Sequence, residues 1–340
     1  MEEKKRTGFW MTLTGIVLVI LPILFFLFSL ALGSYNVGPI DVCQIIWCKL
    51  FGQTPPQDAL TVNVIWQVRL PRVCAAALVG AGLSVAGAVF QGVFRNPLAS
   101  PYTLGVSNGA GFGAALAIVL SLGAAGIQAF AVAFGLLAVA LTFLIASRSR
   151  RNTVTLVLAG MLIGALFSSL VSLLKFTADP LEKLPQIVYW LMGSLSGSTF
   201  EALAKILPFY IVCMAAVFLL RWRTNVLSLG DQEAKSFGLN VRRDRAIVIG
   251  TSSMLTALVV SISGIIGWVG IVVPHLARML VGPDFRKLIP TSVSIGICYL
   301  LVVDDLCRTL TASEIPLGVI TGIIGVPLFL YFIYKKKVSW

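Results

Sequence analysis

The sequence predicts an all-α polytopic membrane protein with about ten transmembrane helices and an inverted-repeat relation between its halves. Three observations support this prediction: an apolar composition, a series of bilayer-length apolar runs, and an uneven distribution of basic residues. Of the 340 residues, 58% are hydrophobic and 12% are charged, whereas soluble domains contain about 25% charged residues. This composition excludes a soluble globule and a disordered chain, and six widely separated cysteines exclude a disulfide-stapled module.

The apolar runs set the expected number of spans, because a helix needs about 20 residues to cross about 30 Å of hydrocarbon. The first run resembles a signal peptide, but its apolar stretch extends from Phe9 to Leu32, beyond an h-region of about 7–15 residues. We therefore expect it to remain as a span. The expected spans are residues 10–32, 66–90, 97–121, 124–146, 154–176, 203–221, 245–266, 268–282, 290–309 and 316–334.

The basic residues orient these spans. The chain has 26 Lys and Arg residues against 14 Asp and Glu residues, a net charge of +12. With the N-terminus inside, 19 of the 26 basic residues fall on the inner side, so the positive-inside rule places both termini in the cytoplasm. The remaining basic residues, on the outer side, are Lys49, Arg69, Arg72, Lys175, Lys183, Lys205 and Arg308.

Small residues recur at every fourth position in several spans. Such rows let helix backbones approach closely in lipid, so they predict a densely packed bundle. The rows are Gly80, Ser84, Ala88 and Gly92; Gly105, Gly109, Gly113 and Ala117; and Gly318 and Gly322.

Two stretches, residues 95–101 and 264–278, break the helical pattern with Gly and Pro. Irregular backbone at membrane depth is tolerated only where protein or a water-filled cavity covers it. The two stretches resemble each other faintly and run in opposite directions, which suggests an inverted repeat with a pathway between the halves. Within a single transmembrane domain spanning residues 1–340, the half-repeats are residues 60–176 and 245–334.

The sequence offers no catalytic, metal or cofactor site. His275 is the single histidine, and no His/Cys/carboxylate spacing suits a metal. We therefore expect His275 to be structural. A P-loop is also missing, so the chain is not expected to hydrolyse ATP itself. Ionisable mid-span residues are restricted to Asp304 and Asp305, which favours energy supplied by another subunit over an ion-coupled mechanism.

The longest inner loop, residues 221–245, is the most polar stretch. From Asp231 to Phe237 it is expected to form a short helix, which Gly238 ends in the left-handed conformation. The helix would present apolar contacts amid charge. The loop is therefore either a solvated linker or a docking helix for a cytoplasmic partner, and the apolar contacts favour docking.

The chain contains six long ordered motifs. They are RLPR at 69–72, GAGLSVAGAVFQG at 80–92, NPLASP at 96–101, LGVSNGA at 104–110, VPHLAR at 273–278 and EIPLG at 314–318. These motifs are very similar to those of the permeases of the type II ATP-binding-cassette importers, the iron-chelate/cobalamin (FecCD-like) family. The resemblance covers about residues 60 to 334. It implies a permease subunit that translocates an iron(III)-siderophore or similar metal chelate into the cytoplasm across a bacterial inner or plasma membrane.

Other functions remain open beside this one. The family also carries cobalamin and haem, and some of its members carry oxyanions. An ion-coupled secondary transporter and a membrane scaffold are the alternatives from other classes. The partners implied are a second copy of the chain or a close paralogue, two cytoplasmic ATPase subunits and an extracytoplasmic substrate-binding protein in a lipid bilayer. Nucleic acid is not expected to bind so apolar a chain.

The resemblance also implies residue roles. Outward-facing arginines would dock the binding protein through its carboxylates, although they also fit snorkelling anchors at span ends; they are Arg69, Arg72 and Arg308. The ATPase would contact Leu229, Gly230, Ala234, Phe237, Gly238 and Leu239. The inner gate matches Asn96, Leu98, Thr153 and Val154, where Val154 replaces a hydroxyl residue of relatives. Outside, Cys43 and Cys48 are candidates for a disulfide.

Overall fold

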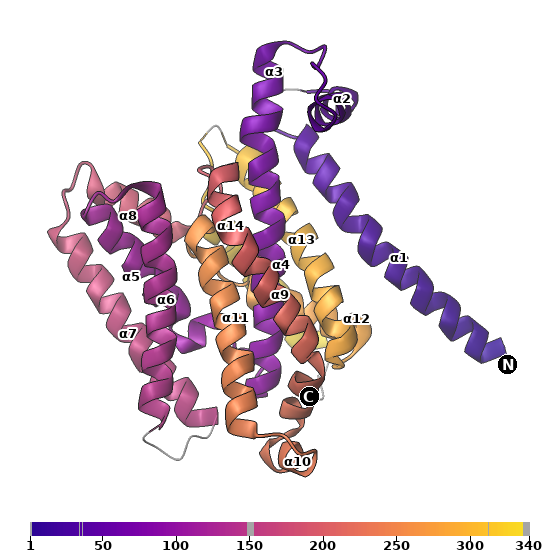
Figure 1. Cartoon of the computed structure of the whole chain (residues 1–340), viewed down its shortest axis with the longest axis vertical. Coiled ribbons are helices and arrows are strands. Elements are labelled where there is room, and N and C mark those ends of the chain that lie inside the picture. The colour runs from indigo at the N-terminus through magenta and orange to yellow at the C-terminus, as the bar shows by residue number, and fades with distance from the viewer. Residues whose placement is uncertain (1, 34, 36, 148–152, 312, 336–340) are drawn as a thin grey trace.

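The protein is an elongated helical bundle (Figure 1). The computed structural model describes residues 2–33, 35, 37–147, 153–311 and 313–335. The other residues, and the side chains of residues 2–14, 153, 333 and 335, lie outside the description. Throughout the described ranges the regular structure is helical, without strands. The predicted all-α class is therefore confirmed.

The described helices include a π-helical turn, η1, and a 3₁₀ turn, η2. In chain order the elements are α1 (Glu2–Ala31), α2 (Pro39–Leu50), α3 (Ala59–Asn63), η1 (Val64–Arg69), α4 (Leu70–Phe94), η2 (Pro101–Leu104), α5 (Val106–Val119), α6 (Gly123–Ser147), α7 (Thr153–Thr177), α8 (Lys183–Met192), α9 (Phe200–Leu229), α10 (Asp231–Ser236), α11 (Val241–Ser263), α12 (Val269–Val281), α13 (Phe285–Thr309) and α14 (Leu317–Lys335).

Six of the described helices are long and apolar enough to cross a membrane, the continuous helix Ala59–Phe94 among them. Four shorter apolar helices lie at Gly15–Ala31, Val106–Val119, Val269–Val281 and Leu317–Phe332. Each expected span coincides with one of these helices. The described helices thus agree with a polytopic membrane protein, while the count of ten crossings and the inverted repeat stay predictions.

Helix α4 lies at the centre of the bundle. Its apolar window is 83% buried, compared with 28% for α9, because a helix that is apolar on every side belongs in the interior. Close packing needs its glycines: a methyl group on Gly80 would overlap the carbonyl oxygen of Gly296 on α13. A methyl group on Gly87 would likewise overlap the carbonyl oxygen of Gly270 on α12. Gly80, from the predicted small-residue row, thus contacts the α13 backbone directly, and Gly87, which lies outside that row, makes the equivalent contact with α12.

Both predicted helix breaks are present, but the second is shorter than predicted, because residues 269–278 lie within α12. α4 ends at Phe94, and Arg95 adopts a left-handed conformation with φ 50° before the turn that leads to η2. α11 ends at Ser263, and Trp268 adopts φ 68° where α12 begins. Protein covers the second break, since Ile266 is buried within it, which meets the requirement for irregular backbone at membrane depth.

The π-helical turn η1 was not predicted, and Pro71 explains it. Pro71 has no N–H to donate to the carbonyl oxygen four residues earlier, and its ring displaces that carbonyl. The preceding N–H of Leu70 bonds instead to Ile65, five residues back. Arg69 ends this turn, and Arg72 lies three residues further along, so both arginines project from one side of the helix.

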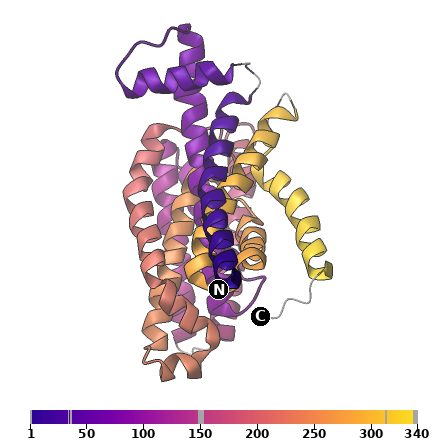
Figure 2. The same ribbon diagram turned by 90° about the vertical axis from the view of Figure 1, so that its right-hand side faces the viewer.

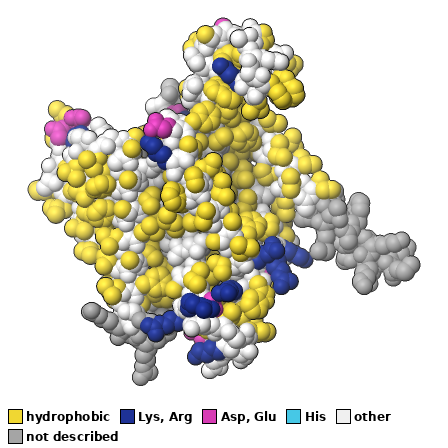
Figure 3. All heavy atoms as spheres, in the orientation of Figure 1, with side chains coloured by type: hydrophobic (Ala, Val, Ile, Leu, Met, Phe, Trp, Pro, Cys, Tyr) yellow, Lys and Arg dark blue, Asp and Glu magenta, His cyan; other side chains and the backbone are white. Residues whose placement is uncertain are grey.

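The bundle has two distinct ends. We call them the α2 end, where α2 and α8 lie, and the α10 end, where α10 lies between α9 and α11 (Figure 1). The start of α1 and the last turn of α14 both lie in the half that contains α10 (Figure 2). Lys and Arg side chains gather at the α10 end on the face in Figure 3. The side chains of Lys4, Lys5, Arg6, Arg148, Arg150, Arg151 and Lys335–Lys337, all expected on the inner side, lie outside the described part.

The backbone contact at Gly87 predicts a large stability loss on substitution. Gly87→Ala forces a methyl group into the carbonyl of Gly270, and we expect overpacking to cost about 1–3 kcal/mol. The apparent unfolding temperature in detergent should fall. The matched control is Gly250→Ala on α11, where nothing lies within 4 Å of the added carbon, and where alanine favours the helix. Equal unfolding temperatures for both variants would contradict the contact.

Candidate functional site

A cluster of buried charges lies at the α2 end, where α4 and α13 meet the end of α1. Its arginines are Arg69, Arg72 and Arg308, and its aspartates are Asp304 and Asp305. Asp304 is fully buried, and Arg72 is 7% exposed. We call this group the arginine cluster. Buried charges are stable only when each is paired, so the pairing inside the cluster determines its role.

Arg72 is the centre of the cluster. Its Nε donates to Asp304 Oδ2 at 3.0 Å and its Nη2 donates to Oδ1 at 2.9 Å, which makes a bidentate pair across α4 and α13. Its Nη1 donates to Glu314 at 2.6 Å. The Glu314 side chain is 35% exposed, so it reaches the pair from the surface segment before α14. Charge-assisted bidentate pairs fix geometry as well as adding energy.

The other two arginines hold the end of α1. Arg69 Nη1 donates to the carbonyls of Leu30 and Ala31 at 3.0 and 3.1 Å, and Arg308 Nη1 donates to Leu32 at 2.9 Å. The last carbonyls of a helix lack partners within it and carry its negative dipole end. The two guanidinium groups therefore cap α1 from α4 and α13.

The sequence placed these three arginines on the outer side as docking residues, and it did not predict their pairing within the chain. Arg69 and Arg72 are buried, the Arg308 side chain is 7% exposed, and each has partners within the chain. The sequence did not reveal this because Asp304 lies 232 residues and Glu314 lies 242 residues from Arg72. The available signal was the location of Asp304 and Asp305 toward the same expected outer side as the arginines. Docking of a binding protein on these arginines stays a prediction.

At the α10 end, the predicted short helix is present. α10 runs from Asp231 to Ser236, and Gly238 follows it with φ 78°. The N–H of Leu239 bonds to the carbonyl of Ala234 at 3.0 Å, and the N–H of Gly238 bonds to Lys235 at 2.9 Å. These two bonds form a Schellman motif. The expected left-handed role of Gly238 is confirmed.

The segment around α10 exposes large apolar side chains and is anchored to α11 by an ion pair. Ala234 of α10 is fully buried, while Leu229 at the end of α9 and Phe237 directly after α10 are 56% and 59% exposed. Arg245 of α11 forms an ion pair with Asp231 of α10, and its own side chain is only 6% exposed. The segment is therefore held rigidly while two large apolar groups face outward, an arrangement typical of a protein contact.

A hydrogen-bonded link at the α10 end joins α9 to the start of α13. The Asn225 amide on α9 donates to Asp284 at 2.7 Å, and Asp284 caps α13 by accepting from Arg286 N–H at 2.9 Å. The hydrogen bonds from Arg286 and Asn225 lower the pKa of Asp284. The link is therefore retained at neutral pH and is lost only as pH falls into the acid range.

The predicted gate residues lie on two separate segments. Leu98 N–H donates to the Asn96 side chain at 3.0 Å, which fixes a tight turn after α4. Leu98 is 55% exposed, and Val154 at the start of α7 is 63% exposed. The side chain of Thr153 lies outside the described part. A constriction formed by these segments stays a prediction.

His275 and two cysteines complete the predicted residues. His275 is buried, and its ring lies 5.5 and 5.8 Å from the rings of Phe329 and Phe332. No group of three metal-ligating side chains occurs among the described residues. Cys43 and Cys48 are both free thiols on α2. Five residues on one helix separate them by about 7.5 Å along its axis, beyond the usual reach of a disulfide.

Comparison with known proteins gives consistent matches over most of the chain. A sequence model described as the FecCD transport family matches residues 20–335. The chain is 43% identical over 310 residues to the molybdate import system permease protein MolB of Haemophilus influenzae, covering 91% of each protein. It is 40% identical over 275 residues to an iron chelatin transport system permease protein of Helicobacter pylori, covering 81% of this chain and 83% of the relative.

A solved structure agrees with these sequence matches. It is described as an inward-facing conformation of a metal-chelate type ABC transporter, and it superimposes with a TM-score of 0.85 at 40% identity. The match covers 94% of this chain and 98% of that one.

The Arg72–Asp304 pair predicts a strong energetic coupling. Asp304→Leu alone removes the buried partner of Arg72 and leaves only the partly exposed Glu314, so it should destabilise the protein by about 3–5 kcal/mol. Adding Arg72→Met should recover much of that loss, because apolar side chains of similar volume replace buried ion pairs well. The measurement is the unfolding temperature of each single variant and of the double variant, compared with the wild type.

The exposed Glu201–Lys205 pair on α9, at 2.7 Å, provides the control. Glu201→Gln should change the unfolding temperature little, since exposed pairs contribute little. Additive effects of the two cluster substitutions would contradict the coupling.

Proposed function

We propose, from the premise that this chain belongs to the FecCD transport family, that it is the permease subunit of an ATP-binding-cassette importer for an iron chelate. Its homologues are permease subunits and not enzymes, and ATP hydrolysis resides in separate subunits. The observation that carries the proposal is the family match over residues 20–335. The secondary-transporter and scaffold alternatives are thereby set aside.

The proposed orientation places the α10 end in the cytoplasm and the α2 end outside. Its support is the gathering of basic side chains at the α10 end (Figure 3), which the positive-inside rule assigns to the cytoplasm. The start of α1 and the end of α14 lie in the same half (Figure 2). Both termini are then cytoplasmic in a bacterial inner or plasma membrane.

The proposed assembly has two permease copies, or one copy with a paralogue, around a shared pathway. The support for this assembly is the match to the FecCD transport family, because a permease of an importer of this kind implies a second permease subunit. Ten spans and inverted half-repeats at 60–176 and 245–334 belong to this proposal. Asn96, Leu98, Thr153 and Val154 are its proposed inner gate.

The substrate proposed first is an iron(III)-siderophore, by similarity to the iron chelatin permease at 40% identity. Cobalamin and haem are the alternative substrates, and either would be imported by the same machinery. A second candidate is molybdate, which the relative at 43% identity over 91% of the chain supports. Selection between substrates is assigned to the binding protein, because the spans offer mainly small and apolar side chains.

Uptake into proteoliposomes tests the function. Vesicles with the permease, its ATPase and its binding protein should accumulate radiolabelled iron(III) chelate only with ATP. Parallel vesicles with labelled molybdate distinguish the second candidate. Uptake of either substrate without ATP and without the ATPase would contradict the importer.

Phe237 and Leu229 are proposed to contact the ATPase at the α10 end. Phe237→Asp should reduce binding of the ATPase subunit and the ATP-driven uptake by about tenfold, because a charge replaces an exposed apolar contact. The measurement is ATPase affinity for the permease in nanodiscs. Gln232→Ala, also exposed on α10, is the control and should bind normally; an equal loss for both variants would remove Phe237 from the interface.

The binding protein is proposed to dock at the α2 end, where Glu314 competes for Arg72. Glu314 holds Arg72 Nη1 and is itself partly exposed, so a carboxylate of the binding protein would replace it. Substituting Arg72 directly would break the buried pair with Asp304. Removing the charge of Glu314 is therefore the cleaner test.

Glu314→Gln should raise the affinity of the binding protein several-fold at low salt, because its carboxylate no longer competes for Arg72. Titration of the binding protein against permease in nanodiscs measures this effect. Glu182→Gln is the matched control, since Glu182 is exposed and lies 3.6 Å from Lys183 rather than Arg72. Weaker binding by the Glu314 variant would contradict the exchange.

A further inference from the structure

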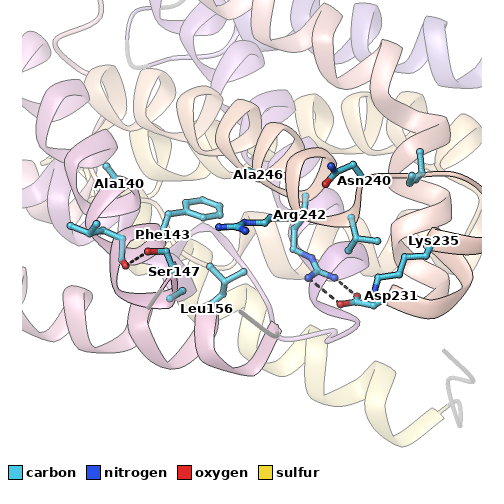
Figure 4. Close-up of a pocket in the computed structure, with 14 residues that line it drawn as sticks. Ala140, Phe143, Ser147, Leu156, Asp231, Lys235, Asn240, Arg242 and Ala246 are labelled. Atoms are coloured by element: carbon cyan, nitrogen blue, oxygen red, sulfur yellow. Dashed lines mark hydrogen bonds and ion pairs between the residues drawn. The ribbon is translucent and has the colours of Figure 1, made fainter. Parts of the chain in front are cut away.

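A cavity of about 730 Å³ lies at the α10 end, between α6–α7 on one side and α10–α11 on the other (Figure 4). The site needs none of residues 148–152, which join α6 to α7. Ala140, Phe143, Leu144, Ala146, Ser147 and Leu156 line the first side; Asp231, Lys235, Leu239, Asn240, Val241, Arg242, Arg245 and Ala246 line the second.

The two sides of the cavity differ in chemistry. The α6–α7 side is apolar, with Phe143, Leu144 and Leu156 on it. The α10–α11 side holds Lys235, Arg242 and Arg245 against the single carboxylate of Asp231, which leaves two net positive charges. An apolar wall facing a cationic wall suits a ligand with an anionic head and an apolar tail.

The cationic wall contains hydrogen-bond donors that are not paired with an acceptor in the described part of the chain. Arg245 is 5% exposed and pairs with Asp231 through its terminal nitrogens, yet its buried Nε has no acceptor among the described residues. No ion pair involves Lys235 or Arg242 in the described part of the chain. The Arg242 side chain extends across the cavity toward Phe143 (Figure 4). A buried donor without an acceptor is costly, so an anionic group would complete the site.

The apolar wall continues onto the outside of the bundle. Leu144 is 54% exposed, and Ala140 one turn earlier on α6 is also exposed. A soluble anion needs no such wall, whereas an acyl chain would follow it along α6. Basic pockets between membrane helices on the cytoplasmic side are typical sites for anionic lipid headgroups.

We propose that this cavity binds an anionic phospholipid of the inner leaflet, with its phosphate at Lys235, Arg242 and Arg245 and an acyl chain along α6. The inference rests on the proposed orientation, which places the α10 end in the cytoplasm. The phosphate would contact α10 through Lys235 and α11 through Arg242. The lipid would therefore brace α10 from behind its exposed residues Leu229 and Phe237.

Native mass spectrometry of the full chain tests the proposal, with phosphatidylglycerol and phosphatidylcholine as probes. The wild type should retain phosphatidylglycerol in preference to phosphatidylcholine. The double variant Lys235→Gln, Arg242→Gln should lose about tenfold in phosphatidylglycerol affinity. The matched control is Arg243→Gln, Lys287→Gln, which also removes two positive charges. Arg243 is 63% exposed, Lys287 is exposed, and neither lines the cavity.

The outcomes separate a bound lipid from a soluble anion and from an effect of net charge. Equal losses of phosphatidylglycerol affinity for the control and for the Lys235→Gln, Arg242→Gln variant would show an effect of net charge alone, which overturns the site. Displacement of phosphatidylglycerol by soluble glycerol 3-phosphate would show that the head alone binds, which overturns the lipid. Loss of the lipid when the ATPase binds would show that the cavity is part of the ATPase interface, which overturns the lipid site. The unfolding temperatures of the wild type and of both variants should be equal in phosphatidylcholine nanodiscs. Equal values exclude misfolding as the cause of weaker lipid binding.

Failure of the lipid site and failure of the importer are distinguishable. The lipid experiment uses the permease alone and needs no transport. ATP-dependent uptake that persists in vesicles without phosphatidylglycerol, together with unselective lipid binding, would overturn the lipid site and leave the importer intact.

Discussion

Direct backbone contact between α4 and α13 is the constraint on which the rest of the structure depends. Gly80 and Gly296 meet with no room for a side chain on either, so the register of these two helices is fixed. Arg72 lies eight residues before Gly80, and Asp304 lies eight residues after Gly296, each about 12 Å along its helix. Because the helices are antiparallel, the glycine contact brings the buried arginine opposite its aspartate.

The two ends of the bundle use charge in different ways. At the α2 end, charges are buried and paired, and they fix α1 to α4 and α13. At the α10 end, Arg245 anchors α10 while Lys235 and Arg242 line a cavity and Phe237 faces outward. A rigid α2 end and an α10 end with exposed apolar groups agree with a permease that receives its energy from a partner.

Local features were predictable from the sequence, and long-range pairings were not. The breaks after Phe94 and Ser263 and the left-handed Gly238 follow from nearby Gly and Pro, so they were predicted correctly. The burial of Arg72 depends on Asp304 and Glu314, which are distant in the chain, so this burial was not predicted. α2 and α8 were missed because they are too short to cross a membrane. The cavity was missed because α6 and α11 meet only in the fold.

The orientation of the bundle is the claim on which every functional assignment depends, and cysteine labelling measures it most directly. Cys43 is exposed on α2, at the proposed outer end. A membrane-impermeant maleimide should label Cys43 in intact cells. In a variant carrying Cys43→Ser, Cys48→Ser and Ser236→Cys, which leaves no cysteine on α2, the position on α10 should be labelled only after the membrane is permeabilised. Labelling of the α10 position in intact cells, with Cys43 protected, would contradict the account.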